Sequence, residues 1–240
     1  MERNYNIEYL KKYYNGNLED AIKRLDNNEA VQYIVGNVNF YGYELDVNKN
    51  VLIPRRETEE LVYEVINRAK NFNNPVIIDV GTGSGAIAIT LSKELKSHVY
   101  ASDISPDALD VAKKNCTKTK ADITFYEGDM LKPYIDNNIK ADIIVSNPPY
   151  IKLDEEIEDV VKNNEPHLAL YAQDNGLEYY KKILSTAKEI LNDKFLIAFE
   201  IGNTQANDIK NIVKKYFKDV KVEVKKDLSD NDRMFFVYNY

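Results

Sequence analysis

The sequence is poor in the residues that build disulfides and metal sites. Its 240 residues include one cysteine, Cys116, and two histidines, His98 and His167. A single cysteine excludes an internal disulfide framework and a site made from several cysteines. Two histidines argue against a histidine-built zinc site. We therefore expect no metal.

Long apolar runs are also missing. No stretch approaches the roughly 20 apolar residues that a membrane-spanning helix needs. The first residues, MERNYNIEYLKKYY, contain no apolar signal-peptide core. We therefore expect a cytoplasmic protein that has no membrane partner.

An excess of basic residues is missing as well. The 32 Lys and Arg stand against 39 Asp and Glu, which gives a net charge of −7. Stable binding to nucleic acid relies on dense Lys and Arg that neutralise phosphates, so we expect none here. The remaining composition, 44% hydrophobic and 30% charged, is typical of a globular protein with one or two domains.

A glycine-rich turn follows a predicted buried strand at Val76–Ile78 and precedes an apolar helix from Ala86 to about Leu95. Glycines let a backbone turn tightly and approach a ligand closely. The spacing is G-x-G-x-G, whereas the dinucleotide fingerprint is G-x-G-x-x-G. Asp79, two residues before the first glycine, fits S-adenosylmethionine (SAM), whose charged amino group needs a carboxylate or carbonyl partner. The predicted cofactor contacts in this stretch are Asp79, Gly81, Thr82, Gly83, Ser84 and Gly85.

Two further acids follow predicted strands. Asp103 comes after the strand from His98 to Ser102, where a carboxylate suits both ribose hydroxyls. Dehydrogenases share this acid, so Asp103 alone does not separate NAD from SAM. Asp129 and Met130 follow the strand around 123–126, where they could hold the adenine amino group and ring face.

The sequence Asn147-Pro148-Pro149-Tyr150 directly follows a buried strand, ADIIVS. The prolines end the strand because they cannot donate to a sheet ladder. The Asn147 amide and the Pro148 carbonyl could hold a planar NH2 group by both hydrogens, and the Tyr150 ring could lie against its face. A lone Asn-Pro would more simply be a polar turn. The full tetrapeptide after a buried strand favours a site that presents an amino or amide nitrogen.

The segments on either side of this core have weaker patterns. Residues 1 to about 30 are expected to be helical, with Asn17 as a cap, and Tyr33–Pro54 to form strands in a hairpin arrangement with a turn at 48–50. Thr58 is a reasonable N-cap for the next helix. Residues 151–174 are acidic and irregular, with a short helix near 153–161, and could form a lid or substrate wall.

The C-terminal part predicts helices at 177–191 and 204–216, a strand at 195–200, and closing strands near 220–224 and 234–238. A final antiparallel hairpin on a parallel sheet is typical of SAM-dependent methyltransferases. The fold prediction is therefore α/β: a class I SAM-dependent methyltransferase with a Rossmann-like, mostly parallel seven-stranded sheet. We predict a short helical arm and β-hairpin at 1–54, followed by the methyltransferase domain at 55–240.

From about Tyr33 to the C-terminus the chain resembles the peptide chain release factor glutamine methyltransferases, the PrmC or HemK family. The glycine turn alone marks only the superfamily, and NPPY alone is shared with adenine-N6 methyltransferases. The Ile-Pro-Arg segment combined with both is much more specific. The motifs that carry the resemblance are Leu52–Arg55 with Glu57–Glu59, Asp79–Gly85, Asp103–Ser105, Asn147–Ile151, Glu165-Pro166, Gly176-Leu177, Glu200–Gly202 and Asp232-Arg233.

The resemblance implies methyl transfer from SAM, which leaves S-adenosylhomocysteine, to the glutamine side-chain amide in the Gly-Gly-Gln loop of class I bacterial release factors. It implies catalytic roles for Asn147, Pro148 and Tyr150, and it places Asn147 beside the cofactor as well. The implied substrate contacts are Asn147, Pro148, Pro149, Tyr150, Arg55 and Glu57. From the residues alone, Arg55 and Glu57 would be solvated charges at a helix start.

Two departures from the family pattern concern the partner. Only some thirty residues precede the predicted hairpin, fewer than in the family's usual helical N-terminal domain, and Arg56 replaces the family's usual proline. The alternative function is an adenine-N6 methyltransferase acting on DNA or RNA, because an exocyclic NH2 fits the same clamp. A SAM-binding protein without catalysis would predict a damaged clamp, and this one is complete.

Overall fold

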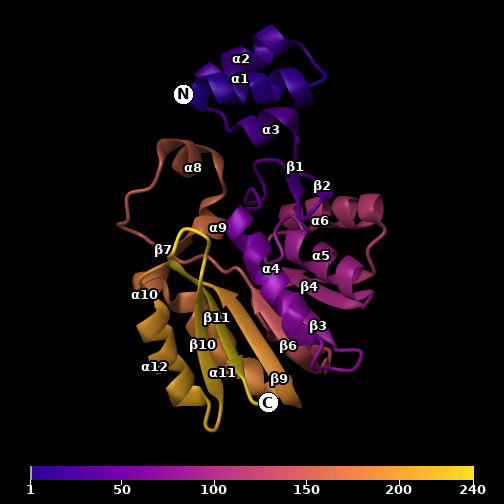
Figure 1. Ribbon diagram of the computed structural model, residues 1–240, viewed down its shortest axis with the longest axis vertical. Helices are drawn as coiled ribbons and strands as arrows, with labels where there is room; N and C mark the ends of the chain where they lie inside the picture. Colours follow the sequence, from indigo (N-terminus) through magenta and orange to yellow (C-terminus); the bar gives the residue numbers. More distant parts are fainter. Residues whose placement is uncertain (1) are drawn as a thin grey trace.

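The computed structural model describes residues 2–240, and its centre is one seven-stranded sheet (Figure 1). The strand order is β10-β11-β9-β6-β3-β4-β5. The strands are β3 (Ile77–Val80), β4 (Val99–Asp103), β5 (Ile123–Glu127), β6 (Ala141–Ser146), β9 (Leu191–Glu200), β10 (Lys221–Lys226) and β11 (Asp232–Tyr238). The predicted α/β methyltransferase sheet is confirmed.

The strand directions define where a ligand can bind. β3 pairs in parallel with both β4 and β6, while β11 lies antiparallel between β9 and β10. The chain runs outward from β3 through β4 to β5 and then returns to the other side of β3 with β6. Ligands in such sheets bind at the carboxyl ends of the strands where the order reverses. The reversal here lies between β3 and β6.

Alternation along the buried strands sends side chains to two separate cores. In β6, Ile144 belongs to one cluster, whereas Ile143 and Val145 belong to the other. The first cluster is covered by α7 (Lys132–Asp136), α11 (Glu178–Thr186), the 3-10 turn η1 (Ala187–Glu189) and α12 (Ala206–Tyr216). The second is covered by α4 (Arg56–Ala69) and α5 (Ala86–Leu95), and α6 (Pro106–Thr119) packs beside α5. Both faces of the sheet are therefore buried, as near-continuous apolar strands require.

The N-terminal helices form a small cluster of their own beyond the sheet (Figure 1). They are α1 (Glu2–Tyr13), α2 (Leu18–Asp26) and α3 (Val31–Val35). Asn17 caps α2, because its side chain accepts the Glu19 N–H at 2.9 Å. The predicted strand at Tyr33 is wrong. Helix α3 contains this residue and ends at Gly36, whose φ is +87°.

The hairpin is shorter than its predicted extent. β1 (Asn37–Phe40) and β2 (Tyr43–Asp46) are joined by a turn at Tyr41 and Gly42. The predicted turn at 48–50 is present, because the Val51 N–H donates to the Asn48 carbonyl at 3.1 Å, but it does not join two strands. Residues 51–53 form no strand. Phe40 and Leu45 of the hairpin belong to the same core cluster as α4 and α5. The division of the chain at residue 54 stays a prediction.

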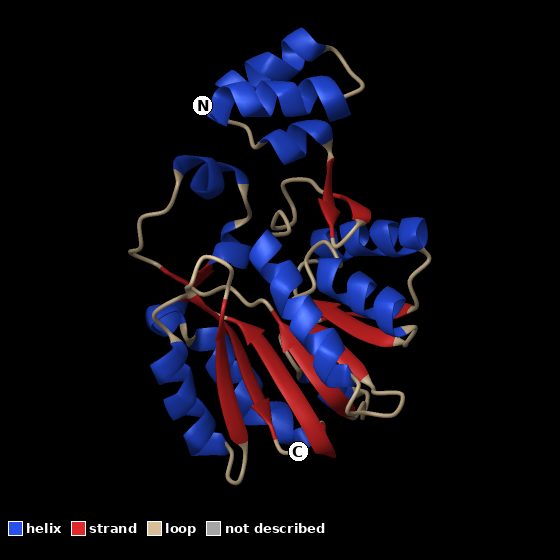
Figure 2. Ribbon diagram, viewed as in Figure 1, coloured by secondary structure: helices blue, strands red, loops and turns tan. Residues whose placement is uncertain are grey.

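The excursion after β6 contains short elements joined by loops (Figure 2). Its helix α8 begins at Asp159, later than predicted. Asn164 fixes the excursion to the N-terminal part, because its amide nitrogen donates to the Asn28 carbonyl at 2.7 Å. The elements are β7 (Ile151–Lys152), α8 (Asp159–Asn164), α9 (His167–Leu170), β8 (Tyr171–Ala172) and α10 (Gln173–Gly176).

Within residues 2–240, no helix combines the length and apolar character needed to cross a membrane. The same residues hold no cluster of three or more His, Cys, Asp or Glu side chains with a metal-binding arrangement.

Candidate active site

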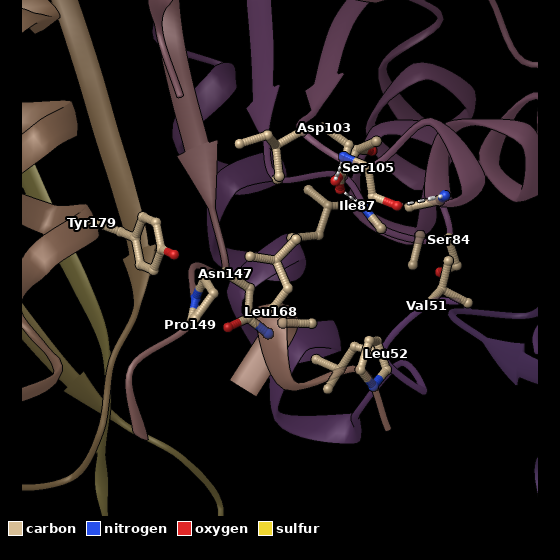
Figure 3. Close-up of a pocket in the computed structure, with 18 of the residues that line it drawn as sticks. Val51, Leu52, Ser84, Ile87, Asp103, Ser105, Asn147, Pro149, Leu168 and Tyr179 are labelled. Carbon is tan, nitrogen blue, oxygen red and sulfur yellow. Dashed lines mark hydrogen bonds between the residues drawn. The ribbon is translucent and has the colours of Figure 1, made fainter. Parts of the chain in front are cut away.

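A deep cleft opens at the carboxyl ends of β3, β4 and β6 (Figure 3). Its empty volume is about 1130 Å³, open solvent included, which is ample for a nucleoside-sized ligand. In Figure 3, Asp103 and Ser105 lie on one side of the cleft and Asn147 and Tyr179 lie across it. The predicted site residues that line it are Arg55, Gly81, Thr82, Gly83, Ser84, Asp103, Asp129, Met130, Asn147 and Pro149.

The glycine turn leaves open space where side chains would stand. Gly81 and Gly83 have φ values of +72° and +55°, and a Cβ at either would meet nothing within 4 Å. A ligand can therefore approach the backbone closely. Gly85 differs, since its Cβ would lie 3.3 Å from the Cβ of Ala112 in α6. Gly85 permits the packing of α5 on α6 and does not line the cleft.

Asp103 ends β4 with its carboxylate at the cleft. One oxygen accepts the Gly83 N–H at 2.8 Å, and the other accepts the Ser105 N–H at 2.9 Å. Burial raises the pKa of Asp103, and these backbone N–H groups oppose the rise. An ionised carboxylate has about four lone-pair positions, so capacity remains for two ligand hydroxyls.

Asp79 lies beneath the turn and outside the cleft. Its side chain is fully buried, and Oδ2 accepts the Thr82 hydroxyl at 2.6 Å and the Ala88 N–H at 3.2 Å. Its Oδ1 has no hydrogen-bond partner. Burial raises the pKa of Asp79 to about 7. Asp79 supports the turn. Its contact with the amino group of SAM stays a prediction.

The far side of the cleft combines Asp129 and Met130 with residues that the sequence reasoning missed. Asp129 forms an ion pair with Lys182 of α11 at 3.4 Å. Tyr179 lies one turn before Lys182 and also lines the cleft, and Ile104 adds an apolar wall next to Asp103. Helical spacing places Tyr179 and Lys182 on one face, but nothing local indicates that the face borders a cleft. The open backbone, the strand-end carboxylate and the apolar walls together fit an adenosine-bearing cofactor.

Asn147 is held by helix α4. Its amide nitrogen donates to the Thr58 hydroxyl oxygen at 3.2 Å. Thr58 is therefore not the N-cap that its sequence position suggested, because Arg55 occupies that position and α4 begins at Arg56. The Thr58 hydroxyl instead donates at 2.6 Å to Glu200 at the end of β9.

A second, smaller pocket adjoins the cleft, and Asn147 lines both. Pro148 and Tyr150 line only the smaller one, which has an empty volume of about 420 Å³. We call this the acceptor pocket. Its lining residues are Leu52, Arg55, Asn147, Pro148, Tyr150, Ile151, Val161, Ala169, Leu170 and Glu200. The excursion thus contributes a wall of this pocket.

Tyr150 is tied down at its hydroxyl. The Tyr150 hydroxyl donates to Glu200 Oε1 at 3.2 Å and receives a hydrogen bond from Arg233 at 3.4 Å. Burial raises the pKa of Tyr150, and the Glu200 charge raises it further. The tyrosine is therefore a neutral, fixed wall of the acceptor pocket.

The two charged residues predicted to contact substrate lie differently. Arg55 lines both cavities and forms an ion pair with Glu165, which is 5% exposed. Its guanidinium also donates to the Ile53 carbonyl at 2.9 Å. Glu57 is half-buried and lines neither cavity.

Three features together define a SAM-dependent methyltransferase. They are the mostly parallel seven-stranded sheet with one antiparallel strand near its edge, the G-x-G-x-G turn, and the acid at the end of the next strand. The profile of the family "Methyltransferase small domain" matches residues 58–169. The release factor glutamine methyltransferase of Bacillus subtilis (strain 168) is 45% identical over 85% of this chain and 73% of its own length. The enzyme of the same name from Clostridium acetobutylicum is 39% identical over 97% of this chain and 82% of its own length. The chain belongs to the family of release factor glutamine methyltransferases.

Solved structures resemble the fold at low sequence identity. A methyltransferase from Pyrococcus furiosus matches with a TM-score of 0.61 and 17% identity, over 92% of this chain and 98% of that one. The hMettl16 catalytic domain, solved with an RNA hairpin, matches with a TM-score of 0.65 and 17% identity, over 83% of this chain and 75% of that one. SMU.776, a putative methyltransferase complexed with SAH, matches with a TM-score of 0.59 and 15% identity, over 84% of this chain and 55% of that one. These likenesses support the methyltransferase fold.

Proposed function

We propose that this enzyme methylates the side-chain amide nitrogen of the glutamine in the Gly-Gly-Gln motif of class I bacterial release factors. The observation that carries the proposal is the meeting of two cavities at Asn147. One cavity has room for the methyl donor, and the other, which is smaller, has room for an amide side chain. The names of the relatives support the substrate class. We expect the protein to act in the cytoplasm with these factors.

The larger cleft holds the cofactor in this proposal. Asp103 accepts the ribose hydroxyls, the turn at Gly81 and Gly83 admits close backbone approach, and Asp129 with Met130 borders the adenine. When bound, SAM supplies an electrophilic methyl group on a positively charged sulfur. No metal takes part in this proposal.

The acceptor pocket orients the glutamine. An amide nitrogen is a poor nucleophile, because its lone pair is delocalised into the carbonyl. Asn147 Oδ1 and the Pro148 carbonyl accept its two N–H bonds and turn the nitrogen toward the cleft, while Tyr150 and Pro149 border the amide. Orientation of this kind supplies several kcal/mol of barrier reduction. The nitrogen would form a bond to the methyl carbon as the bond between that carbon and the SAM sulfur breaks; S-adenosylhomocysteine would be the leaving group, and the proton lost from the nitrogen would go to solvent.

The entrance to the acceptor pocket is bordered by charge. Arg55 lines it and keeps donors beyond those used by Glu165 and Ile53, so it can meet a backbone carbonyl of an incoming loop. Glu57 lies on the same first turn of α4, outside both cavities. Its predicted contact with the partner would be made at the protein surface.

The test is methyl transfer from labelled SAM to a purified class I release factor. The matched control is the same factor with its Gly-Gly-Gln glutamine replaced, and bare DNA and RNA are the alternative acceptors. Label in the unaltered factor alone supports the proposal. Label in nucleic acid would support an adenine-N6 methyltransferase instead, and label in the altered factor would overturn the assigned glutamine.

A further inference from the structure

Three side chains from distant parts of the chain form a hydrogen-bonded row at the wall of the acceptor pocket. The Thr58 hydroxyl of α4 donates to Glu200 Oε2 of β9 at 2.6 Å, although 142 residues separate them. The same Thr58 oxygen accepts the Asn147 amide nitrogen at 3.2 Å. Thr58 is 4% exposed and Glu200 is 2% exposed. The hydrogen bond between Thr58 and Glu200 is therefore shielded from water and has few alternatives.

The direction of the hydrogen bonds along this row is set at Glu200. An ionised carboxylate only accepts, so the single proton of the Thr58 hydroxyl points to Glu200. The Thr58 oxygen then offers only lone pairs to Asn147. Asn147 must turn its NH2 group to Thr58, which leaves Oδ1 on the opposite edge of the planar amide group.

The opposite direction of these hydrogen bonds would remove the acceptor from the site. If the Thr58 proton pointed to Asn147, the asparagine amide would turn over and present its NH2 group where an acceptor is needed. Two NH2 groups would then face each other in the acceptor pocket. Whether Asn147 presents an acceptor or a donor to the acceptor pocket thus depends on Thr58, which lines the cofactor cleft and not the acceptor pocket.

The surroundings of Glu200 favour the accepting state. Tyr150 donates to its Oε1 at 3.2 Å, so both carboxylate oxygens accept a hydroxyl. Arg233 lies behind Tyr150, with its guanidinium 3.4 Å from the tyrosine hydroxyl, and its positive charge stabilises the carboxylate. Asp227 holds that guanidinium at 3.1 Å.

We propose that Thr58, oriented by the Glu200 carboxylate, is a positioning residue that fixes the Asn147 amide with Oδ1 toward the acceptor pocket. This inference rests on the proposed function for its kinetic effect. The fixed orientation of the Asn147 amide does not depend on which substrate the enzyme methylates.

The experiment compares Thr58→Val with Thr58→Ser in the full chain. Valine keeps the shape and loses the hydroxyl, whereas serine keeps the hydroxyl. Thr119→Val is the matched control, because the Thr119 hydroxyl donates at 2.7 Å to the Asn115 carbonyl within α6. Because valine leaves Glu200 Oε2 without this partner, Thr58→Ala, which leaves room for water, is made as a second variant.

The kinetic readout is kcat and KM for the release factor, with the SAM dissociation constant measured separately. We expect Thr58→Val and Thr58→Ala to lower kcat roughly 10- to 100-fold. We expect SAM affinity to change by less than about threefold in every variant, with kcat near wild type in Thr58→Ser and Thr119→Val. A wild-type kcat in both folded Thr58→Val and Thr58→Ala would overturn the inference.

The second readout needs no turnover. In protein labelled with 15N at asparagine, the Asn147 side-chain NH2 signals are identified by their absence in Asn147→Ala. We expect these signals to shift in Thr58→Val and Thr58→Ala and to stay in place in Thr58→Ser and Thr119→Val. If the wild-type enzyme labels no release factor, the proposed function fails and the spectrum alone tests the role of Thr58. Asn147 signals that do not move in Thr58→Val would overturn that role.

Discussion

Arg55 donates a hydrogen bond to the carboxylate of Glu165, which lies 110 residues further along the chain. Glu165 also accepts the Ile53 N–H at 3.0 Å. These contacts join the excursion after β6 to the loop that precedes α4, and both segments line the acceptor pocket. The pair therefore closes the pocket from the side, and part of Arg55 is already committed to the protein itself.

Removal of this carboxylate should loosen both segments. We expect Glu165→Ala to lower the free energy of unfolding by about 1–3 kcal/mol, because the Ile53 N–H loses its acceptor and Arg55 loses its partner. Urea denaturation measures the change. Glu156→Ala, at an exposed position of the same excursion, is the control and should stay within about 0.5 kcal/mol of wild type. Equal effects of the two substitutions would contradict the assigned role.

Asp103 should matter chiefly for the cofactor. We expect Asp103→Ala to weaken SAM binding at least about tenfold, because two hydroxyls would lose a charged acceptor. Titration calorimetry with SAM measures this directly. Asp110→Ala, on the exposed face of α6, should bind SAM as wild type does. Unchanged affinity in Asp103→Ala would remove the ribose assignment.

Asn147 should separate catalysis from cofactor binding. We expect Asn147→Ala to lower kcat roughly 100- to 1000-fold, the usual cost of a hydrogen-bonding group that acts on the reacting atoms. SAM binding should change little, because Asn147 only borders that cleft. Asn211→Ala, on the exposed side of α12, is the matched control. A kcat within a few-fold of wild type in Asn147→Ala would rule out the clamp.

The sheet and the turn around the cofactor cleft could be predicted because their signals are local. Val76–Ile78 is an apolar, β-branched run that precedes a glycine turn, and β3 begins one residue later and ends two residues later than that prediction. A serine followed by a proline is also a local signal for a helix start, and Ser105 caps α6 by accepting the Ala108 N–H at 3.2 Å, with Pro106 at the first helical position.

The misplaced elements were decided by distant contacts. Val51–Ile53 has the composition of a strand, but the Ile53 N–H is satisfied by Glu165 and so needs no neighbouring strand. Thr58 precedes two carboxylates as an N-cap would, yet its hydroxyl has a partner 142 residues away. A contact of this kind has no local signature. The acceptor pocket, built from four separate stretches of chain, could not be assembled from the sequence for the same reason.

Asp79 should make stability depend on pH. Burial raises its pKa to about 7 in the folded chain, whereas an ordinary aspartate, as in the unfolded chain, has a pKa of 3.8. The folded chain therefore binds the Asp79 proton more tightly than the unfolded chain does. The resulting contribution to the free energy of unfolding is complete below pH 4 and is lost as pH rises toward 7. The slope is at most about 1.4 kcal/mol per pH unit.

Asp79→Asn isolates this effect, because asparagine does not titrate. We expect the free energy of unfolding of the wild type to fall more steeply between pH 4.5 and 7 than that of the variant, as measured in urea without cofactor. Asp103 and Glu200, whose pKa values burial also raises, are present in both proteins and cancel. Parallel curves would show that Asp79 titrates as an ordinary carboxylate.

Arg233 should control the acid limit of catalysis. Burial raises the pKa of Glu200, and the Thr58 hydrogen bond, the Arg233 charge and the Tyr150 hydrogen bond oppose the rise, while Glu57 adds to it. Once protonated, Glu200 donates to Thr58 instead of accepting, and the Asn147 amide turns over. We therefore expect kcat to fall as pH decreases through the pKa of Glu200.

Removal of the Arg233 charge should move that fall to higher pH. We expect the acid limb of the kcat profile to shift upward in Arg233→Gln and much less in Arg233→Lys, which keeps the charge. The profile is measured at saturating SAM and release factor, so that kcat reports groups in the loaded enzyme. Because Tyr150 keeps its proton throughout this range, a shift identifies a carboxyl group that is sensitive to the Arg233 charge, which means Glu200 or Asp227. If the acid limbs of the wild type and Arg233→Gln superimpose, the protonation of Glu200 does not limit kcat. Thr58 would then orient Asn147 independently of the Glu200 charge.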